Sequence, residues 1–435
     1  MVEVLDLYCG MGGLSLGFAQ ALGARITGLD IDKWAVETYN LNLGRFGCRA
    51  MVQDVLEWEP EGEFDLIIGG SPCQPFSIAN TKRRGEDHPL FPTFPRFFDV
   101  VLELKPKAFL MENVKGLITK TFARYLVQQL SRLQDYCVKY AVLNAVNYGV
   151  PQKRERLFVV GIRKDLGVSF EFPRPTHAQE EYADLDGKTV KKWITLREAI
   201  EDIMYIPPVE GKKPIQTNPR HGRPADLDKP SGTIKVDGRG GDFCHDTILV
   251  PARKMTEKQK AWYRKRWEER EFDRTILFID SGGEVVEIPW IPYQDAYPPL
   301  DLDEPSRTLY SHIAKWSRDA LLPITDHITT ALDPSKVWGN KWGTRVIEAV
   351  SCSGQLLPIV YRRLTVRECL RIQSFPDWWR FPDGCSISRR YKLVGEAVPP
   401  ILAYRLAVAI GKSLGLEVRS VTADEWSIPY FDRAF

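Results

Sequence analysis

Cys73 is the residue of this sequence best placed to act as a nucleophile. It lies in the loop Gly69-Gly-Ser-Pro-Cys-Gln-Pro-Phe-Ser77, directly after the apolar run Phe64–Ile68, which predicts a buried strand. A lone cysteine is more often a small core residue than a nucleophile. The glycines and prolines around Cys73 instead fix an irregular loop, where it is a poor core residue. A free cysteine has a pKa near ~8.5, so the loop must activate the thiol or its substrate.

A glycine-rich turn, Asp6–Phe18, follows the first predicted strand and opens a helix. Its glycines allow a ligand to approach the backbone closely. Ser15 replaces the third glycine of the Gly-x-Gly-x-x-Gly pattern that binds dinucleotides, which argues against a ligand that contains a pyrophosphate. Asp30 ends the second predicted strand, where an acid commonly takes a ribose hydroxyl pair, and Asp54 closes a third apolar stretch. This pattern suits an adenosine with a cationic tail; the alternative is a tight turn with two helix-capping aspartates.

Three charged residues flank two further predicted strands. Glu112 ends the apolar run that begins at Ala108, and Arg154 and Arg156 precede the apolar run Leu157–Gly161. Alternation along an extended segment places both arginines on one face. Alternatively, Glu112 is an ordinary capping acid at a strand end, and the two arginines form a solvated strand end.

The first 165 residues alternate short apolar runs with helical patterns, which predicts a parallel α/β sheet. Open sheets of this kind bind ligands at the carboxyl ends of their strands. The predicted strands are Val2–Leu7, Arg25–Asp30, Phe64–Gly69, Ala108–Met111 and Leu157–Gly161. Helices are predicted at Trp34–Leu43, Phe122–Gln134, Thr365–Ile372 and Ile401–Leu414.

The composition changes twice along the 435 residues. From about residue 185 Pro, Gly, Lys, Arg and Trp become frequent, and near residue 355 the α/β pattern returns. We therefore expect a large α/β domain of residues 1–185 and 356–435, interrupted by a smaller domain at 186–355.

Composition sets broad limits on the class of protein. With 44% hydrophobic and 27% charged residues the chain is expected to be globular, and its net charge of +2 neither requires nor excludes a nucleic-acid partner. No apolar run reaches the roughly 18 residues of a membrane span, and the first residues lack a signal-peptide pattern, so we expect a cytoplasmic protein. The dispersed cysteines and histidines form no Cys-x-x-Cys pair, so neither a disulfide framework nor a metal site is expected.

Six short motifs occur in an order that resembles the DNA cytosine-5 methyltransferase family of the restriction–modification type. They are Asp6–Phe18, Pro72-Cys73-Gln74, Glu112-Asn113-Val114, Gln152–Arg156, Arg363–Glu368 and Gly395–Val398. Single short motifs arise by chance, but six in the family's order do not. The resemblance covers roughly residues 1–165 and 360–412. It implies a Rossmann-like S-adenosylmethionine-dependent methyltransferase domain with a smaller inserted target-recognition domain.

The resemblance also implies a mechanism. A cytosine is flipped out of a specific double-stranded DNA sequence, at a cost of a few kcal/mol, so that Cys73 can add covalently to its carbon 6. Carbon 5 then takes the methyl group. Glu112 would hold ring nitrogen 3 and the exocyclic amine, which calls for a raised pKa in a dry pocket. Arg156 would contact the base carbonyl, with Arg154 as nearby support.

The cofactor implied by the resemblance is S-adenosylmethionine, with S-adenosylhomocysteine as product. The residues assigned to it are Tyr8, Gly10, Gly12, Gly13, Asp30, Ile31, Asp54, Val55, Pro72, Glu396 and Ala397. Tyr8 stands where the family usually has Phe, and it keeps an aromatic face for the adenine. Glu396 stands where the family normally has Asn; an acid there changes the hydrogen-bond pattern and adds negative charge near a cationic donor.

Two sets of basic residues are candidates for DNA contact. Lys82, Arg83 and Arg84 follow the cysteine loop and predict a mobile segment that closes over the phosphate backbone, the alternative being a solvated charge run. Arginine is the commonest bidentate partner of guanine. The candidate guanine readers of the variable segment are Arg220, Arg223, Arg239 and Arg307.

Double-stranded DNA is the expected partner of a monomeric enzyme, and a cognate restriction endonuclease would act separately. One alternative is an RNA cytosine-5 methyltransferase, because one branch of the family acts on transfer RNA; the long variable segment argues for duplex DNA. A second alternative is a catalytically inactive DNA-binding homologue. Intact Cys73, Glu112 and Arg156 argue against it, whereas Glu396 keeps it open.

Overall fold

The computed structural model describes residues 1–76, 85–203 and 366–435, and five strands between residues 274 and 360. The chain divides into two compact units. The first consists of Met1–Trp193 and Gln373–Phe435, and the second of Ile194–Ile372. The second unit thus interrupts the first in sequence.

A seven-stranded sheet forms the centre of the first unit, with the order β3-β2-β1-β4-β5-β8-β6. The first five strands in this order pair in parallel. The order reverses between β1 and β4, which is where open α/β sheets bind ligands beyond the carboxyl ends of their strands. The strands are β1 (Glu3–Leu7), β2 (Arg25–Asp30), β3 (Arg49–Val52), β4 (Leu66–Gly69), β5 (Ala108–Asn113), β6 (Tyr136–Asn144) and β8 (Glu155–Arg163).

The prediction of a wholly parallel sheet is wrong for its last two strands. β8 runs antiparallel to both β5 and β6, with Leu157 opposite Asn113. The beginning of β8 therefore lies beside the carboxyl end of β5. The sequence predicts no strand at β6, an edge strand in which only Tyr136 and Leu143 are buried and Lys139 interrupts the apolar residues.

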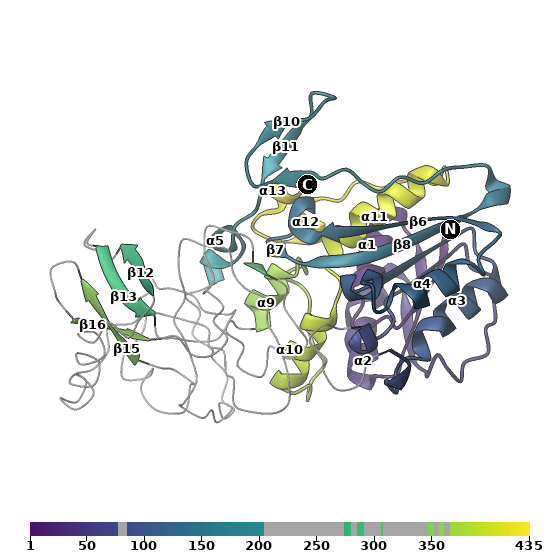
Figure 1. Cartoon of the computed structure of the whole chain (residues 1–435), viewed down its shortest axis with the longest axis horizontal. Coiled ribbons are helices and arrows are strands. Elements are labelled where there is room, and N and C mark those ends of the chain that lie inside the picture. Colours follow the sequence, from purple (N-terminus) through teal and green to yellow (C-terminus); the bar gives the residue numbers. More distant parts are fainter. Residues whose placement is uncertain are drawn as a thin grey trace. The chain divides into compact units, whose positions relative to one another are not determined.

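Helices cover both faces of the sheet (Figure 1). Leu5 and Leu7 of β1 join an apolar cluster with α3 and α4, whereas Asp6, which points to the other face, accepts a hydrogen bond from Ser15 of α1. The helices of this unit are α1 (Gly13–Leu22), α2 (Lys33–Leu43), α3 (Thr93–Leu104), α4 (Ala123–Leu130), α10 (Ile387–Glu396), α11 (Pro400–Ser413), α12 (Ala423–Trp426) and α13 (Phe431–Ala434). The helices predicted at residues 34–43 and 401–414 agree with α2 and α11 to within one residue, whereas α4 ends at Leu130.

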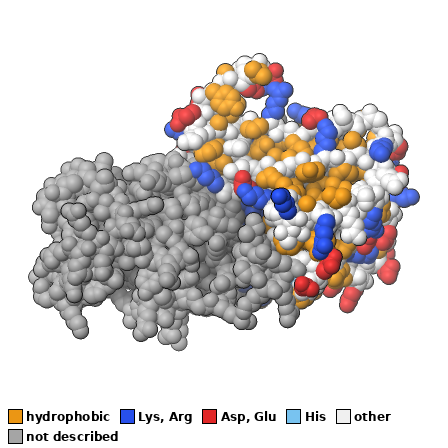
Figure 2. Space-filling view, in the orientation of Figure 1, with side chains coloured by type: hydrophobic (Ala, Val, Ile, Leu, Met, Phe, Trp, Pro, Cys, Tyr) orange, Lys and Arg blue, Asp and Glu red, His pale blue; other side chains and the backbone are white. Residues whose placement is uncertain are grey.

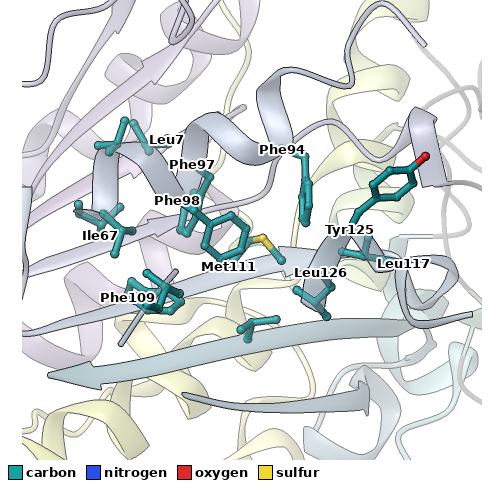
Figure 3. Close-up of a cluster of buried hydrophobic side chains, with 14 of the residues drawn as sticks. Leu7, Ile67, Phe94, Phe97, Phe98, Phe109, Met111, Leu117, Tyr125 and Leu126 are labelled. Carbon is teal, nitrogen blue, oxygen red and sulfur yellow. The ribbon is translucent and has the colours of Figure 1, made fainter. Parts of the chain in front are cut away.

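Aromatic rings fill the space between the sheet and α3 (Figure 3). Phe97, Phe98 and Phe109 are buried, and their ring centroids lie 5.4, 6.2 and 6.3 Å apart in edge-to-face arrangements. Such pairs contribute about 0.5–1.5 kcal/mol each beyond the burial of apolar area. Because Phe109 belongs to β5, this packing fixes the strand that ends with Glu112 and Asn113.

Helix α11, in the last part of the chain, packs against α1, so that distant parts of the sequence form one domain. At Gly17 of α1 a Cβ atom would lie 2.4 Å from the backbone nitrogen of Tyr404. The stretch Ile387–Ser413 is long and apolar enough to cross a membrane by length and composition, but 72% of its most apolar window is buried inside the protein. It also comprises two helices, α10 and α11, separated by Ala397–Pro399.

Each unit also contains a smaller sheet of its own. In the first unit, the sheet β10-β11-β9 comprises Tyr182–Ala183, Thr189–Lys192 and His177–Ala178, and β7 is Gln152–Lys153. In the second unit, the antiparallel sheet β12-β13-β15-β16 comprises Arg274–Ile279, Val285–Trp290, Val346–Ser351 and Leu356–Val360. The second unit also contains α5 (Leu196–Ile200), α9 (Val366–Ile372) and β14 (Ser306–Arg307).

A glycine in β8 provides a test of the aromatic packing. A Cβ atom at Gly161 would lie 2.1 Å from the ring of Phe109, which its neighbours hold in place. We expect Gly161→Ala to lower the free energy of unfolding by about 1–3 kcal/mol, as overpacking of a core does. Gly44→Ala is the control, because a Cβ atom there would meet nothing within 4 Å. Equal effects of the two substitutions in urea unfolding would contradict this packing.

Candidate active site

The loop that carries Cys73 is anchored to the end of the neighbouring strand. The side-chain amide of Asn113 donates to the carbonyl and the hydroxyl oxygen of Ser71, at 3.2 and 3.1 Å. The backbone nitrogen of Phe76, whose ring is fully buried, donates to the Cys73 carbonyl at 3.0 Å. These contacts hold Cys73 as a free, half-buried thiol rather than as a core residue.

Glu112 and Arg156 form a buried ion pair beside this loop. Arg156 Nε donates to Glu112 Oε1 at 2.9 Å, and each residue is only 8% exposed. Glu112 lies opposite Phe158 in the antiparallel register, so Arg156, two residues earlier in β8, shares its face of the sheet. A Cβ atom at Gly70 would lie 3.0 Å from Glu112 Oε2, so the cysteine loop passes close over this carboxylate.

The charges of this pair act on the pKa values of the site. Burial raises the pKa of the Glu112 carboxyl, an effect that Arg156 and then Arg154 oppose. Burial also raises the pKa of the Cys73 thiol; Arg156 opposes the rise, and Glu112 and Glu396 add to it. The structure therefore brings Cys73, Glu112, Arg154 and Arg156 into one electrostatic environment. The thiol is mostly protonated near neutral pH, so the substrate must promote formation of the thiolate.

Arg154 connects these residues to the C-terminal part of the unit. It is 1% exposed, and its Nη1 donates to the carbonyl of Gly395 at 3.2 Å. Three residues later, the carbonyl of Val398 approaches the glycine turn, where a Cβ atom at Gly13 would lie 2.2 Å from it. Only glycine allows this contact. The segment Gly395–Val398 thus touches both the buried arginine and the glycine turn.

The glycine turn is tied to the end of β2 through Asp30. The backbone nitrogens of Gly10 and Asp32 donate to the two oxygens of Asp30, each at 2.8 Å. Gly10 and Gly12 have φ values of 54° and 98°, in the left-handed region that favours glycine. A Cβ atom at Gly10 would meet nothing within 4 Å, so the turn leaves open space beside Asp30.

Four further predicted cofactor residues follow the ends of the neighbouring strands β1, β2 and β3. Ile31 directly follows Asp30 and is 71% exposed. Asp54 is half-buried after β3, and Val55 beside it is buried. Tyr8 is half-buried after β1, and its hydroxyl donates to the Thr93 carbonyl at 2.8 Å. Carboxylates for a ribose and an apolar surface for a base are thus both present, which fits an adenosine-containing group.

The last predicted cofactor residues lie in the two connecting segments. Pro72 is half-buried beside Cys73, and Ala397 is 9% exposed beside Glu396. Glu396 ends α10 and is paired with Lys392, Nζ to Oε2, at 2.9 Å. The sequence predicts no helix at residues 387–396, so the pairing of Lys392 with Glu396, four residues apart on one face of α10, was not expected.

Most of the predicted DNA contacts lie outside the described residues. These are Lys82, Arg83, Arg84, Arg220, Arg223 and Arg239, whereas Arg307 belongs to the short strand β14. On the face of the described residues that Figure 2 shows, acidic and basic side chains are interspersed around an apolar area. Among the described residues no group of three or more His, Cys, Asp or Glu side chains is arranged to hold a metal ion.

Comparison with known proteins identifies a family for this chain. A family model described as C-5 cytosine-specific DNA methylase matches residues 2–412. The Type II methyltransferase M.MthTI of Methanothermobacter thermautotrophicus is 30% identical over 419 residues, which cover 95% of this chain and 98% of that protein. M.FnuDI of Fusobacterium nucleatum, also a Type II methyltransferase, is 28% identical and covers 95% of both chains.

Solved structures share the fold at lower identity. A variant of Spodoptera frugiperda DNMT2 is 17% identical with a TM-score of 0.51, covering 95% of this chain and 100% of that chain. The Entamoeba histolytica methyltransferase EhMeth is 14% identical with a TM-score of 0.52, covering 95% and 99%. The sheet described above is therefore the Rossmann-like fold of these methyltransferases.

The raised pKa of the Cys73 thiol predicts slow alkylation. Because the thiolate is the reactive form, iodoacetamide should modify Cys73 more slowly than the exposed Cys137 at pH 7, and the Cys73 rate should keep rising above pH 9. Arg156→Gln should slow it further at a given pH, since Arg156 favours the thiolate. Peptide mass spectrometry measures both rates. Faster alkylation of Cys73 than of Cys137 at neutral pH would contradict the electrostatics described here.

Proposed function

The chain belongs to the C-5 cytosine-specific DNA methylase family, and we propose that Cys73, Glu112 and Arg156 carry out the reaction of this family in it. The protein is a DNA (cytosine-5) methyltransferase of the restriction–modification type. The main observation behind the residue assignment is the buried ion pair of Glu112 and Arg156, whose Oε1 and Nε atoms are 2.9 Å apart. The loop that contains Cys73 passes close over this pair.

Cys73 makes carbon 5 of cytosine nucleophilic enough to accept a methyl group. Its thiolate forms a bond to carbon 6, and the electron pair of the 5,6 double bond moves so that carbon 5 becomes nucleophilic. S-adenosylmethionine, the methyl donor general to the family, supplies an electrophilic methyl group when bound. Loss of the proton from carbon 5 and departure of the Cys73 thiolate from carbon 6 then restore the aromatic ring.

Glu112 and Arg156 stabilise the charge that this addition creates. Because burial raises the pKa of Glu112, its carboxyl can share a proton with ring nitrogen 3, where negative charge develops. The Arg156 guanidinium holds that carboxyl in place and can donate to the base carbonyl. Arg154 supports the site through the hydrogen bond that it donates to the Gly395 carbonyl.

The residues around the glycine turn are proposed to bind the cofactor. Asp30 accepts the ribose hydroxyls, Ile31 and Tyr8 offer surfaces to the adenine, and Asp54 accepts from its amino group. Gly10, Gly12, Gly13, Val55, Pro72, Glu396 and Ala397 complete the set. The support is the open space at Gly10 beside Asp30.

Recognition of the DNA sequence is assigned to the middle of the chain, residues 186–355. The support is that a compact unit of residues 194–372 interrupts the catalytic unit in sequence. Arg220, Arg223, Arg239 and Arg307 are the proposed base readers, and Lys82, Arg83 and Arg84 the proposed backbone contacts. The substrate is one specific double-stranded sequence, whose target cytosine is flipped out; the enzyme acts in the cytoplasm as a monomer, separately from any cognate endonuclease.

The proposed function is tested with radiolabelled S-adenosylmethionine, plasmid DNA and, in parallel, transfer RNA. We expect label only in the DNA, and bisulfite sequencing should place it at cytosines within one short repeated sequence. Label in RNA alone would contradict the DNA substrate. Absence of label in both, from folded protein that binds the cofactor, would favour a catalytically inactive homologue.

Substitution of the nucleophile separates catalysis from binding. We expect Cys73→Ala to reduce methyl transfer by at least about 10³-fold, because no other group can form the bond to carbon 6, while cofactor affinity stays within about twofold. Cys137→Ala, at an exposed cysteine in β6, is the matched control and should remain active. Filter binding and label transfer measure the two quantities. Loss of cofactor binding in Cys73→Ala would mean that the loop is structural.

Substitution of Asp30 tests the cofactor assignment. Asp30→Ala removes a carboxylate that orders the glycine turn and is proposed to bind the ribose, so cofactor affinity should fall about tenfold or more. DNA affinity, measured by fluorescence anisotropy, should change by less than about twofold. Asp165→Ala removes an exposed partner of Arg163 and serves as the control. Equal losses of cofactor and DNA affinity would argue against the ribose assignment.

A further inference from the structure

A row of charged side chains on α10 lies next to the end of β2. Residues 389, 392 and 396 follow the spacing of one helix face. Arg389 Nη1 lies 3.0 Å from Asp32 Oδ2, and Lys392 Nζ lies 2.9 Å from Glu396 Oε2 and 3.6 Å from Asp32 Oδ2. Lys392 therefore links Glu396 to the loop that follows Asp30.

Glu396 is placed where it influences the proposed cofactor site. Its neighbour Gly395 is bound by Arg154, and Val398 contacts the glycine turn. The Glu396 side chain is 36% exposed, and its partial burial raises the pKa of its carboxyl. Lys392 opposes that rise, and the negative charge of Asp30 adds to it. Glu396 thus combines access to solvent with electrostatic coupling to Asp30.

The charges around this position do not cancel. Three carboxylates, Asp30, Asp32 and Glu396, are accompanied by two cations, Lys392 and Arg389, which leaves one negative charge when all are ionised. S-adenosylmethionine carries a sulfonium cation, whereas S-adenosylhomocysteine has an uncharged thioether and is otherwise alike apart from the methyl group. A negative potential therefore stabilises the bound donor more than the bound product.

We propose that Glu396, held in place by Lys392, is a specificity-determining residue that makes this site prefer the cationic methyl donor over its neutral product. The inference rests on the proposed function, because it requires that the glycine turn and Asp30 bind the donor. Weaker binding of the product reduces product inhibition over successive methylations. Lys392 limits the effect, since it both orients the Glu396 carboxylate and cancels part of its field.

Calorimetric titration of the full chain at low ionic strength with each of the two ligands tests the proposal. Glu396→Gln nearly preserves the shape of the side chain and removes its charge. We expect the ratio of the product Kd to the donor Kd to fall about fivefold, a size typical of one charge in a partly screened site. Lys392→Gln should raise the ratio, and the double variant should lie near the wild-type value.

The matched control removes the acidic residue of another lysine–glutamate ion pair, away from the proposed cofactor site. Glu171→Gln breaks the exposed pair with Lys139 of β6, at the opposite edge of the sheet from β2 and β3, and should leave the ratio unchanged. A ratio unchanged in Glu396→Gln, with both affinities reduced equally or not at all, would overturn the proposal and leave the proposed function intact. Wild-type protein that binds neither ligand would overturn the cofactor assignment itself.

Discussion

The ion pair between Glu112 and Arg156 is the interaction on which the rest of the site depends. Burying one charged group costs several kcal/mol unless a partner of opposite charge lies close, and here both residues are 8% exposed with Nε and Oε1 2.9 Å apart. The pair requires β8 to run antiparallel to β5, because only then does the beginning of β8 meet the end of β5. Removing either partner would leave a buried charge, so the reversed strand β8 is what keeps both charges paired.

The segment Gly395–Val398 gives the site its second constraint. It is bound by Arg154 on one side and contacts Gly13 on the other, so the buried Arg154 and the glycine turn are joined by the same short stretch of backbone. This stretch belongs to the part of the chain that returns after the second unit. A methyl group can pass directly from donor to base only if both are held rigidly relative to each other, and under the proposed assignments this stretch contributes to that rigidity.

The sequence was informative where chemistry depends on residues close together along the chain. The Cys73 loop and the glycine turn each lie within one strand and its following turn, and the family to which their order pointed is confirmed. The antiparallel β8 and the edge strand β6 depend on tertiary contacts, which no local pattern encodes. The pairing of Lys392 with Glu396 is local, four residues apart on α10, but no helix was predicted there. The roles of individual residues, including the basic residues at 82–84, stay predictions.

The central claim is that Cys73 forms the covalent bond to cytosine. The most direct measurement uses a duplex in which the target cytosine carries fluorine at carbon 5, since elimination then stalls after methyl transfer and traps the adduct. Tryptic peptide mass spectrometry should find the modified nucleotide on the peptide that contains Cys73, and only when S-adenosylmethionine is present. An adduct on a different cysteine, or methylated DNA from an enzyme that forms no adduct with the fluorinated duplex, would contradict the account.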